Sequence, residues 1–149
     1  VPVPLLDHLT AHIGQTGSIV SWNKGYENGR NKDMAALLPH YETALNDIVA
    51  RTVDLQDIFK HGYVHGDFNG STSIKNVLPG MAPELTYANL EVSNGGEAMV
   101  AFAKMLGLPQ GGVRDQLRAD MLAYCALDSF AMVRLFQAVQ DIQSARITP

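Results

Sequence analysis

The segment from residue 120 to residue 136 reads DMLAYCALDSFAMVRLF and constrains the fold more than any other stretch. If it forms a helix, Tyr124 and Asp128 lie four residues apart and emerge on one face, one turn from each other. The rest of that face is apolar and consists of Met121, Ala131 and Leu135. Asp128 is therefore the one charge on a stripe that is typical of a helix facing a core.

A carboxylate on such a stripe requires a partner, because buried charges are usually paired or bound to metal. Two interpretations stay open for Asp128. It is buried with a partner, or it lies at the edge of the stripe, solvated or paired with Arg134. A Tyr-x-x-x-Asp motif by itself is a weak hypothesis, so other parts of the chain have to decide.

Length and composition are those of one folded domain. The chain has 149 residues, of which 46% are hydrophobic and 17% are charged, and these values argue against disorder. Its formal net charge is -4, whereas nucleic-acid binders often show a basic patch or a high pI. An enzyme that holds cations with carboxylates is acidic where it works. The charge therefore does not indicate a nucleic-acid partner, and it leaves one open.

Other features of the sequence bear on the cellular compartment of the protein. Cys125 is the single cysteine, so an internal disulfide cannot form, which fits a reducing compartment. No apolar run approaches the ~18 residues needed to cross a bilayer, and no signal peptide is recognisable. We expect a soluble, cytoplasmic protein without membrane association. The chain opens with Val-Pro-Val-Pro rather than Met, which suggests a piece cut from a longer protein.

Apolar spacing and the positions of Gly and Pro predict helices at 5–13, 28–38, 41–53, 71–78, 96–106 and 113–142. The first four residues, two of them prolines, are expected to be extended. A β-branched run at 17–22 predicts a buried strand. It leads into polar residues 23–27, and open α/β sheets usually carry their ligands at such strand ends. In the glycine-rich loop 60–70, the spacing of His61 and His65 is only weakly indicative of a metal site.

Two motifs together are more informative than either alone. Asn23-x-x-Tyr26-Glu27 resembles the second motif of the DEDD, or DnaQ-like, 3'-5' exonucleases. Tyr124-x-x-x-Asp128 resembles their third motif in its tyrosine form. More closely, the chain resembles a bacterial domain-of-unknown-function family within that superfamily, on the segments 22–27, 73–79, 94–98 and 124–128. The resemblance extends over nearly the whole chain, from about residue 5 to residue 139.

The resemblance implies a helix-rich α/β fold of the RNase H-like type and a two-metal phosphodiesterase that acts on DNA or RNA. Glu27 and Asp128 would bind Mg²⁺ or Mn²⁺, hard cations that require carboxylate oxygens. Tyr124 would orient the attacking water and Asn23 would support the site. Lys75 would meet the phosphate backbone of the substrate, although a solvated surface charge is the simpler interpretation of that residue.

The chain departs from the family pattern in its first motif. These exonucleases carry Asp-x-Glu on an early strand, and no such pair precedes Leu5, so two of the four expected acids are absent. Glu27 also replaces the more usual Asp. We expect residues 1–149 to be a single domain, the C-terminal part of an RNase H-like nuclease domain. The upstream part of the parent protein would supply the missing strands and acids.

Two other interpretations stay open. The chain could be a catalytically inactive nuclease-fold module that binds nucleic acid or protein. It could also be a helical scaffold with accidental motif matches, which predicts that Glu27 and Asp128 lie far apart. A sheet that lacks its first strands would expose an apolar edge, so a homodimer is a further expectation.

Overall fold

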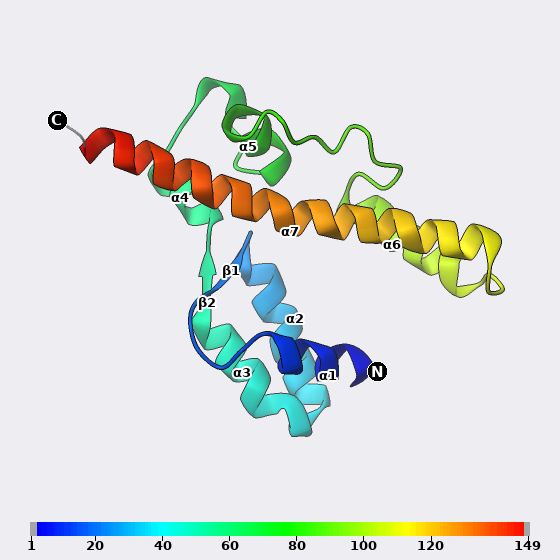
Figure 1. Cartoon of the computed structure of the whole chain (residues 1–149). Coiled ribbons are helices and arrows are strands. Elements are labelled where there is room, and N and C mark those ends of the chain that lie inside the picture. Colours follow the sequence, from blue (N-terminus) through cyan, green and yellow to red (C-terminus); the bar gives the residue numbers. More distant parts are fainter. Residues whose placement is uncertain (1–2, 148–149) are drawn as a thin grey trace. The chain divides into compact units, whose positions relative to one another are not determined.

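The computed structural model describes residues 3–147. The chain divides into two compact units, Val1–Gly62 and Tyr63–Pro149, and each is described in turn (Figure 1). The fold is rich in helix and contains one small parallel sheet, as expected for a helix-rich α/β chain. The expectation of a single domain stays a prediction.

The first unit is a strand–helices–strand arrangement. Its elements are α1 (Val3–His12), β1 (Ile19–Ser21), α2 (Lys24–Leu37), η1 (Pro39–Tyr41), α3 (Glu42–Arg51), β2 (Thr52–Asp54) and α4 (Gln56–His61). Strands β1 and β2 are parallel, with Val20 opposite Val53 at the centre. A strand is thus confirmed within the predicted segment 17–22, but it is not a buried one, because Val20 is 40% exposed and only Ser21 is buried. Because the two strands are parallel, their C-terminal ends lie on the same side of the sheet.

Several boundaries of the first unit differ from the sequence-based expectation. Helix α2 begins at Lys24 rather than at residue 28, so Glu27 lies inside the helix. Val3 and Pro4 are helical rather than extended, because a proline in the first turn lacks only an N–H that would be unpaired anyway. The predicted helix 41–53 ends at Arg51. The β-branched Thr52 and Val53 then form most of β2, as suits their preference for strands. The segment expected as a short transition after Asp54 contains α4.

The core of the first unit joins α1, α2 and α3. Its buried cluster consists of Leu6, Ala35, Leu45 and Ile48. A second buried group lies after β2, where Phe59 is 2% exposed and its ring centroid is 5.4 Å from that of Trp22. This packing fixes β2 and the residues that follow β1, so the polar side chains at the strand ends project from a rigid base.

The second unit is built around one long helix. Its elements are η2 (Gly66–Phe68), α5 (Ile74–Met81), α6 (Gly95–Leu106) and α7 (Gly112–Ile147). Helix α5 contacts α7, and so does α6 (Figure 1). Helix α5 does not end before Pro79, as was expected, but continues to Met81. The proline falls in its last turns, where it removes only one backbone hydrogen bond.

The inner stripe of α7 is confirmed in its C-terminal half. Ala131 and Leu135 are both 0% exposed, and Val77 and Leu78 of α5 are 0% and 1% exposed. Other apolar residues of α7, among them Leu122, are half exposed. Only one face of α7 is therefore committed to the core within the described residues.

The start of α6 is capped by the side chain of Asn94, its N-cap residue. The side chain of Asn94 accepts a hydrogen bond from the N–H of Glu97 at 2.9 Å. The Glu97 carboxylate accepts from the N–H of Ser93 at 2.8 Å and from its hydroxyl at 3.0 Å. The Asn94 side chain thus satisfies one of the backbone donors that the helix itself leaves without a partner, and Glu97 holds the residue before the cap.

Removal of this cap should weaken the second unit. We expect Asn94→Ala to lower the free energy of unfolding by about 1 kcal/mol, the usual cost of losing an N-cap side chain. Asn89→Ala, an exposed position in the preceding loop, serves as the control, and we expect it to change stability by less than about 0.5 kcal/mol. Urea denaturation of both variants measures the difference, and equal effects would contradict the capping role.

One helix in the described part of the chain is long and apolar enough to cross a membrane by length and composition. An 18-residue window within Gly112–Ala145 has a mean hydropathy of 1.3, which differs from the expectation that no such run is present. Only 11% of that window is buried. The core helix of a soluble protein passes the same test, so this observation is weak evidence of a membrane segment.

Candidate functional site

Asp54, at the end of β2, organises the strand ends of the first unit. Its side chain is 5% exposed. Its carboxylate accepts hydrogen bonds from the N–H groups of Asn23 at 2.9 Å and Lys24 at 3.0 Å, and from the N–H of Gln56 at 3.1 Å. Asp54 thus caps α2 from the neighbouring strand. Asp54 was not among the predicted site residues, although residues 53–55 resemble a segment that follows the second motif of the DEDD exonucleases.

Asn23 lies where β1 gives way to α2, as predicted. Its backbone is left-handed, with φ 64° and ψ 59°, and its side chain does not cap the helix. Asparagine tolerates this conformation better than most residues. Its contribution to the strand-end geometry is therefore made through its backbone, and the predicted contact with substrate stays a prediction.

Glu27 lies in the first turn of α2, close to Asp54. Partial burial raises the pKa of the Glu27 carboxyl, its own backbone hydrogen bond lowers it, and the negative charge of Asp54 raises it further. The net direction is upward. Lys60 already lies near this pair, with its ammonium nitrogen 3.8 Å from Oδ2 of Asp54. A further cation would favour the ionised form of Glu27, because it would oppose the negative charge of Asp54.

The raised pKa gives Glu27 a distinct effect on stability. Folding disfavours ionised Glu27, and this penalty is absent below the pKa of the unfolded chain and develops as pH rises through the folded pKa. Glu27→Gln should therefore gain thermal stability relative to the native protein as pH rises from about 4 to 7.

The control for this pH dependence is Glu42→Gln, the same change in the first turn of another helix, α3. It corrects for the general attraction of a helix N-terminus for negative charge. Calorimetry over the pH range measures both variants. A Glu27→Gln midpoint that follows that of Glu42→Gln at every pH would show that the Glu27 environment carries no penalty.

A second polar cluster lies in the second unit and centres on Asp128. The hydroxyl of Tyr87 donates a hydrogen bond of 2.6 Å to Oδ1 of Asp128. Tyr124 lies one turn before Asp128 on α7, so the two residues share one helix face, as predicted. The ring centroids of Tyr87 and Tyr124 are 6.1 Å apart. Burial, followed by the hydrogen bond to Asp128, raises the pKa of both phenols.

The expected alternative partner of Asp128, Arg134, bonds elsewhere. Its Nη2 and Nε lie 2.8 Å and 2.9 Å from Oε1 of Glu84. Within the described residues, Asp128 therefore has phenols rather than a cation beside it. Tyr87, the partner of Asp128, was not among the predicted site residues.

Lys75 belongs to the same neighbourhood. It is exposed, and its ammonium nitrogen lies 5.7 Å from the centroid of the Tyr87 ring. Lys75 and Tyr87 share a cavity of about 210 Å³ with Leu78, Pro79, Leu85, Thr86 and Ala88. The exposure agrees with the simpler interpretation of Lys75 as a surface charge, while its position leaves it available to an anion near Asp128.

The predicted site residues thus form two groups. Asn23 and Glu27 lie with Asp54 in the first unit, and Lys75, Tyr124 and Asp128 lie with Tyr87 in the second. Within residues 3–147, no group of three or more His, Cys, Asp or Glu side chains could hold a metal ion. The donor type, carboxylate oxygen, fits a hard cation. Each of the two groups, however, contains fewer carboxylates than a complete set of ligands for such a cation requires.

The loop histidines do not add to this set. Nδ1 of His65 lies 3.6 Å from a carboxylate oxygen of Asp67 and accepts the N–H of that residue at 3.3 Å. This arrangement is a local turn. It agrees with the low weight given to a transition-metal site in this loop.

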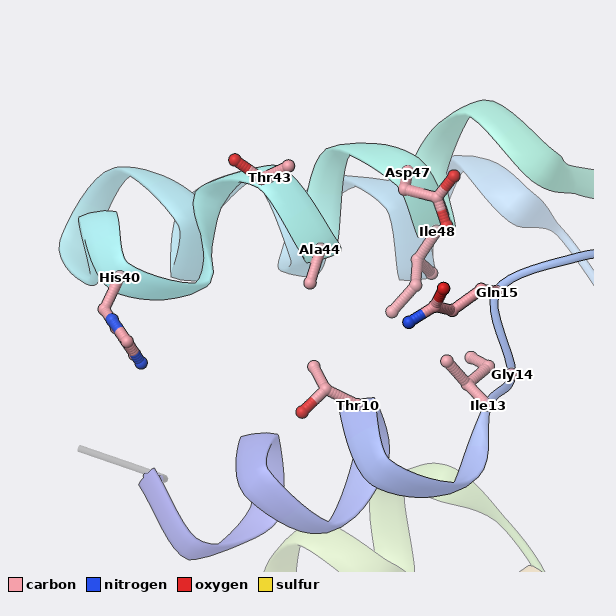
Figure 2. A pocket seen from close by; sticks show the side chains of 9 residues that line it. All are labelled: Thr10, Ile13, Gly14, Gln15, His40, Thr43, Ala44, Asp47 and Ile48. Carbon is pink, nitrogen blue, oxygen red and sulfur yellow. The ribbon is translucent and has the colours of Figure 1, made fainter.

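A larger cavity of about 540 Å³ lies in the first unit. Figure 2 shows Thr10, Ile13, Gly14 and Gln15 on one side and His40, Thr43, Ala44, Asp47 and Ile48 on the other. Its acid, Asp47, is already paired with Arg51 at 2.8 Å. None of the predicted site residues lines this cavity, so it is separate from the strand-end group.

In comparisons with known proteins, one family model matches the first half of the chain. Residues 3–73 match the model of a family described as a domain of unknown function (DUF2779). This match supports the expected resemblance to a domain-of-unknown-function family over that segment. The expected extent of the resemblance to about residue 139 and its link to the DEDD exonucleases stay predictions. No curated protein and no solved structure matched the sequence.

Proposed function

We propose that the chain is part of a metal-dependent 3'-5' exonuclease-like phosphodiesterase of the DEDD type, with an RNase H-like fold. One observation carries the proposal. Asp128 lies on the core-facing stripe of α7, beside Tyr124 and Tyr87, and forms no ion pair within the described residues. A carboxylate in such surroundings is stabilised by a bound cation.

The strand-end group supports the same proposal. Glu27 and Asp54 lie close enough for one negative charge to raise the pKa of the other, at the carboxyl ends of two parallel strands. Ligands of open α/β sheets bind at this edge. Glu27 and Asp128 would each contribute a carboxylate to Mg²⁺ or Mn²⁺, and the upstream part of the parent protein would contribute the other acids.

The bound cations would supply an activated water and stabilise the leaving oxygen of a phosphodiester. The residues of this chain would do the rest. Tyr124, one turn before Asp128 on α7, would orient the attacking water. Lys75 would bind a phosphate of DNA or RNA, and Asn23 would support the position of Glu27.

The small sheet supports the RNase H-like part of the proposal. Within the described residues the sheet has two parallel strands. Parallel sheets are normally covered on both faces. Val20 and Val53 remain 40% and 45% exposed on one face of this one. Additional strands from the parent protein would extend the sheet, and a second copy of the chain could pair with the same edge.

The test is an exonuclease assay of the protein in the full length that its gene encodes. Single-stranded DNA and RNA labelled at the 5' end are incubated with Mn²⁺ or Mg²⁺. We expect stepwise shortening from the 3' end that stops when the metal is chelated. Absence of any metal-dependent hydrolysis of either substrate would overturn the proposal.

A second candidate is a catalytically inactive nuclease-fold module that binds nucleic acid or protein. The observation that favours it is the incomplete set of metal ligands within residues 3–147. This candidate predicts that the protein retains labelled single strands in a gel-shift experiment and does not hydrolyse them with either metal.

A further inference from the structure

The cavity of about 540 Å³ in the first unit has the size of a site for a small molecule. Such sites measure about 300–1,000 Å³ and combine an apolar surface with a few polar groups. The apolar part of this one consists of Ile48, which is 4% exposed, and of the half-buried Ile13 and Ala44. Ala44 and Ile48 point from α3 toward α1 (Figure 2). The space between the two helices therefore has apolar walls that suit a flat molecule.

Two polar side chains of the cavity have hydrogen-bonding capacity to offer a ligand. Gln15 and His40 lie at opposite ends of it (Figure 2), and neither side chain makes a hydrogen bond within the described residues. The ring of His40 contacts that of Tyr41, with centroids 5.1 Å apart, which leaves its ring nitrogens available. The hydroxyl of Thr10 donates to the carbonyl of Leu6 at 2.8 Å, so its oxygen can accept from a ligand.

The charges beside the cavity are already paired. Asp47, which lines it, lies 2.8 Å from Nε of Arg51. Arg51 also donates to the carbonyls of Gly14 at 2.9 Å and Gly17 at 2.8 Å. No Lys or Arg is among the lining residues. The cavity therefore suits an uncharged ligand better than a phosphate.

The Gln15 amide indicates what kind of uncharged ligand fits. An amide carries a donor beside an acceptor, and glutamine uses this pair to bind the edge of an adenine ring. At the far end, a ring nitrogen of His40 can bond a hydroxyl group, as can the oxygen of Thr10. A flat base at one end and a sugar with hydroxyl groups at the other match this order of groups.

We propose that the cavity between α1 and α3 binds a nucleoside, with the base paired to Gln15 and the sugar hydroxyls bonded to His40. This inference does not rest on the proposed function. Glu27, Tyr124 and Asp128 do not line the cavity, and binding requires no metal.

The test titrates the ¹⁵N-labelled full chain with adenosine and follows the amide resonances by NMR. We expect shifts among the amides of α1 and α3 and in the side-chain amide of Gln15. Ala44→Leu places a larger side chain in the cavity and should abolish these shifts. Gln15→Leu should weaken binding by about tenfold or more, the discrimination expected of a paired amide. Gln110→Leu, the same change at an exposed position outside the cavity, should bind like the native chain.

Three results would overturn the proposal. Adenosine could leave the amides of α1 and α3 unshifted, Gln15→Leu could bind adenosine as tightly as the native chain, or adenosine 5'-monophosphate could bind more tightly than adenosine. Equal binding by Ala44→Leu and the native chain would also place the ligand elsewhere. The amide spectrum of each variant shows whether it is folded. If Ala44→Leu does not fold, the comparison of Gln15→Leu with Gln110→Leu still decides.

Discussion

Asp128→Asn is expected to lower metal-dependent hydrolysis by at least about 100-fold. Stabilisation of transition-state charge by a bound cation is worth several kcal/mol, and each 1.36 kcal/mol corresponds to about tenfold in rate. Asparagine keeps the size of the side chain and can still accept the hydrogen bond of Tyr87. The loss would therefore come from the missing charge, and single-turnover rates on a labelled oligonucleotide measure it.

The matched control is Asp120→Asn, two turns earlier on the same helix. Asp120 accepts a hydrogen bond from Gln116 at 2.8 Å, a local surface contact within α7. We expect the rate of this variant to stay within about twofold of the native value, as for a surface change away from the site. Equal losses in both variants would mean that the rate depends on the general charge of α7 and not on Asp128.

Asp54→Ala is expected to have the largest effect on stability. The Asp54 carboxylate accepts three backbone N–H groups and is 5% exposed. Hydrogen bonds to a charged group contribute about 1.5–3 kcal/mol each, and their effects overlap when they share one acceptor. We expect a loss of about 3 kcal/mol or more in the free energy of unfolding of the first unit.

Asp57→Ala controls for the loss of a carboxylate in the same region. Asp57 is 48% exposed, and its nearest cation, Lys60, is 3.7 Å away. An exposed pair of this kind contributes between about 0 and 1 kcal/mol. Urea denaturation of both variants gives the comparison, and a loss in Asp54→Ala no larger than that in Asp57→Ala would show that the cap on α2 is dispensable.

The parts of the fold that the sequence predicted well are those with a local periodic pattern. The inner stripe of α7 follows from residues that recur every three or four positions, and the burial of Ala131 and Leu135 confirms it. The helix predicted at 96–106 is also found, as α6, and its N-cap contact is local, since Asn94 and Glu97 lie three residues apart. Patterns of this length report directly on helix faces and helix ends.

The parts that were missed depend on residues far apart in the chain. Strand β2 has three residues, and helices α2 and α3 separate it in the sequence from its partner β1. Strand preference is strongly affected by such distant neighbours, so a three-residue strand after a helix leaves little local signal. Asp54 and Tyr87 were missed for the same reason, because their contacts with Asn23 and Asp128 span 31 and 41 residues.

Asp128 shows what the sequence could and could not provide. Its position on an apolar stripe correctly indicated that it needs a partner. The nearest positively charged residue in the sequence, Arg134, was a reasonable expectation for this partner. Arg134 instead donates hydrogen bonds to Glu84. The actual partner, Tyr87, comes from an irregular segment whose path no periodic pattern predicts.

The central claim is that Asp128 and Glu27 bind divalent cations, and anomalous diffraction from a crystal soaked in Mn²⁺ tests it most directly. The account predicts manganese peaks within about 2.0–2.6 Å of a carboxylate oxygen of each residue, the range in which hard cations bind oxygen. Manganese bound only at other side chains, with both carboxylates bare, would contradict it.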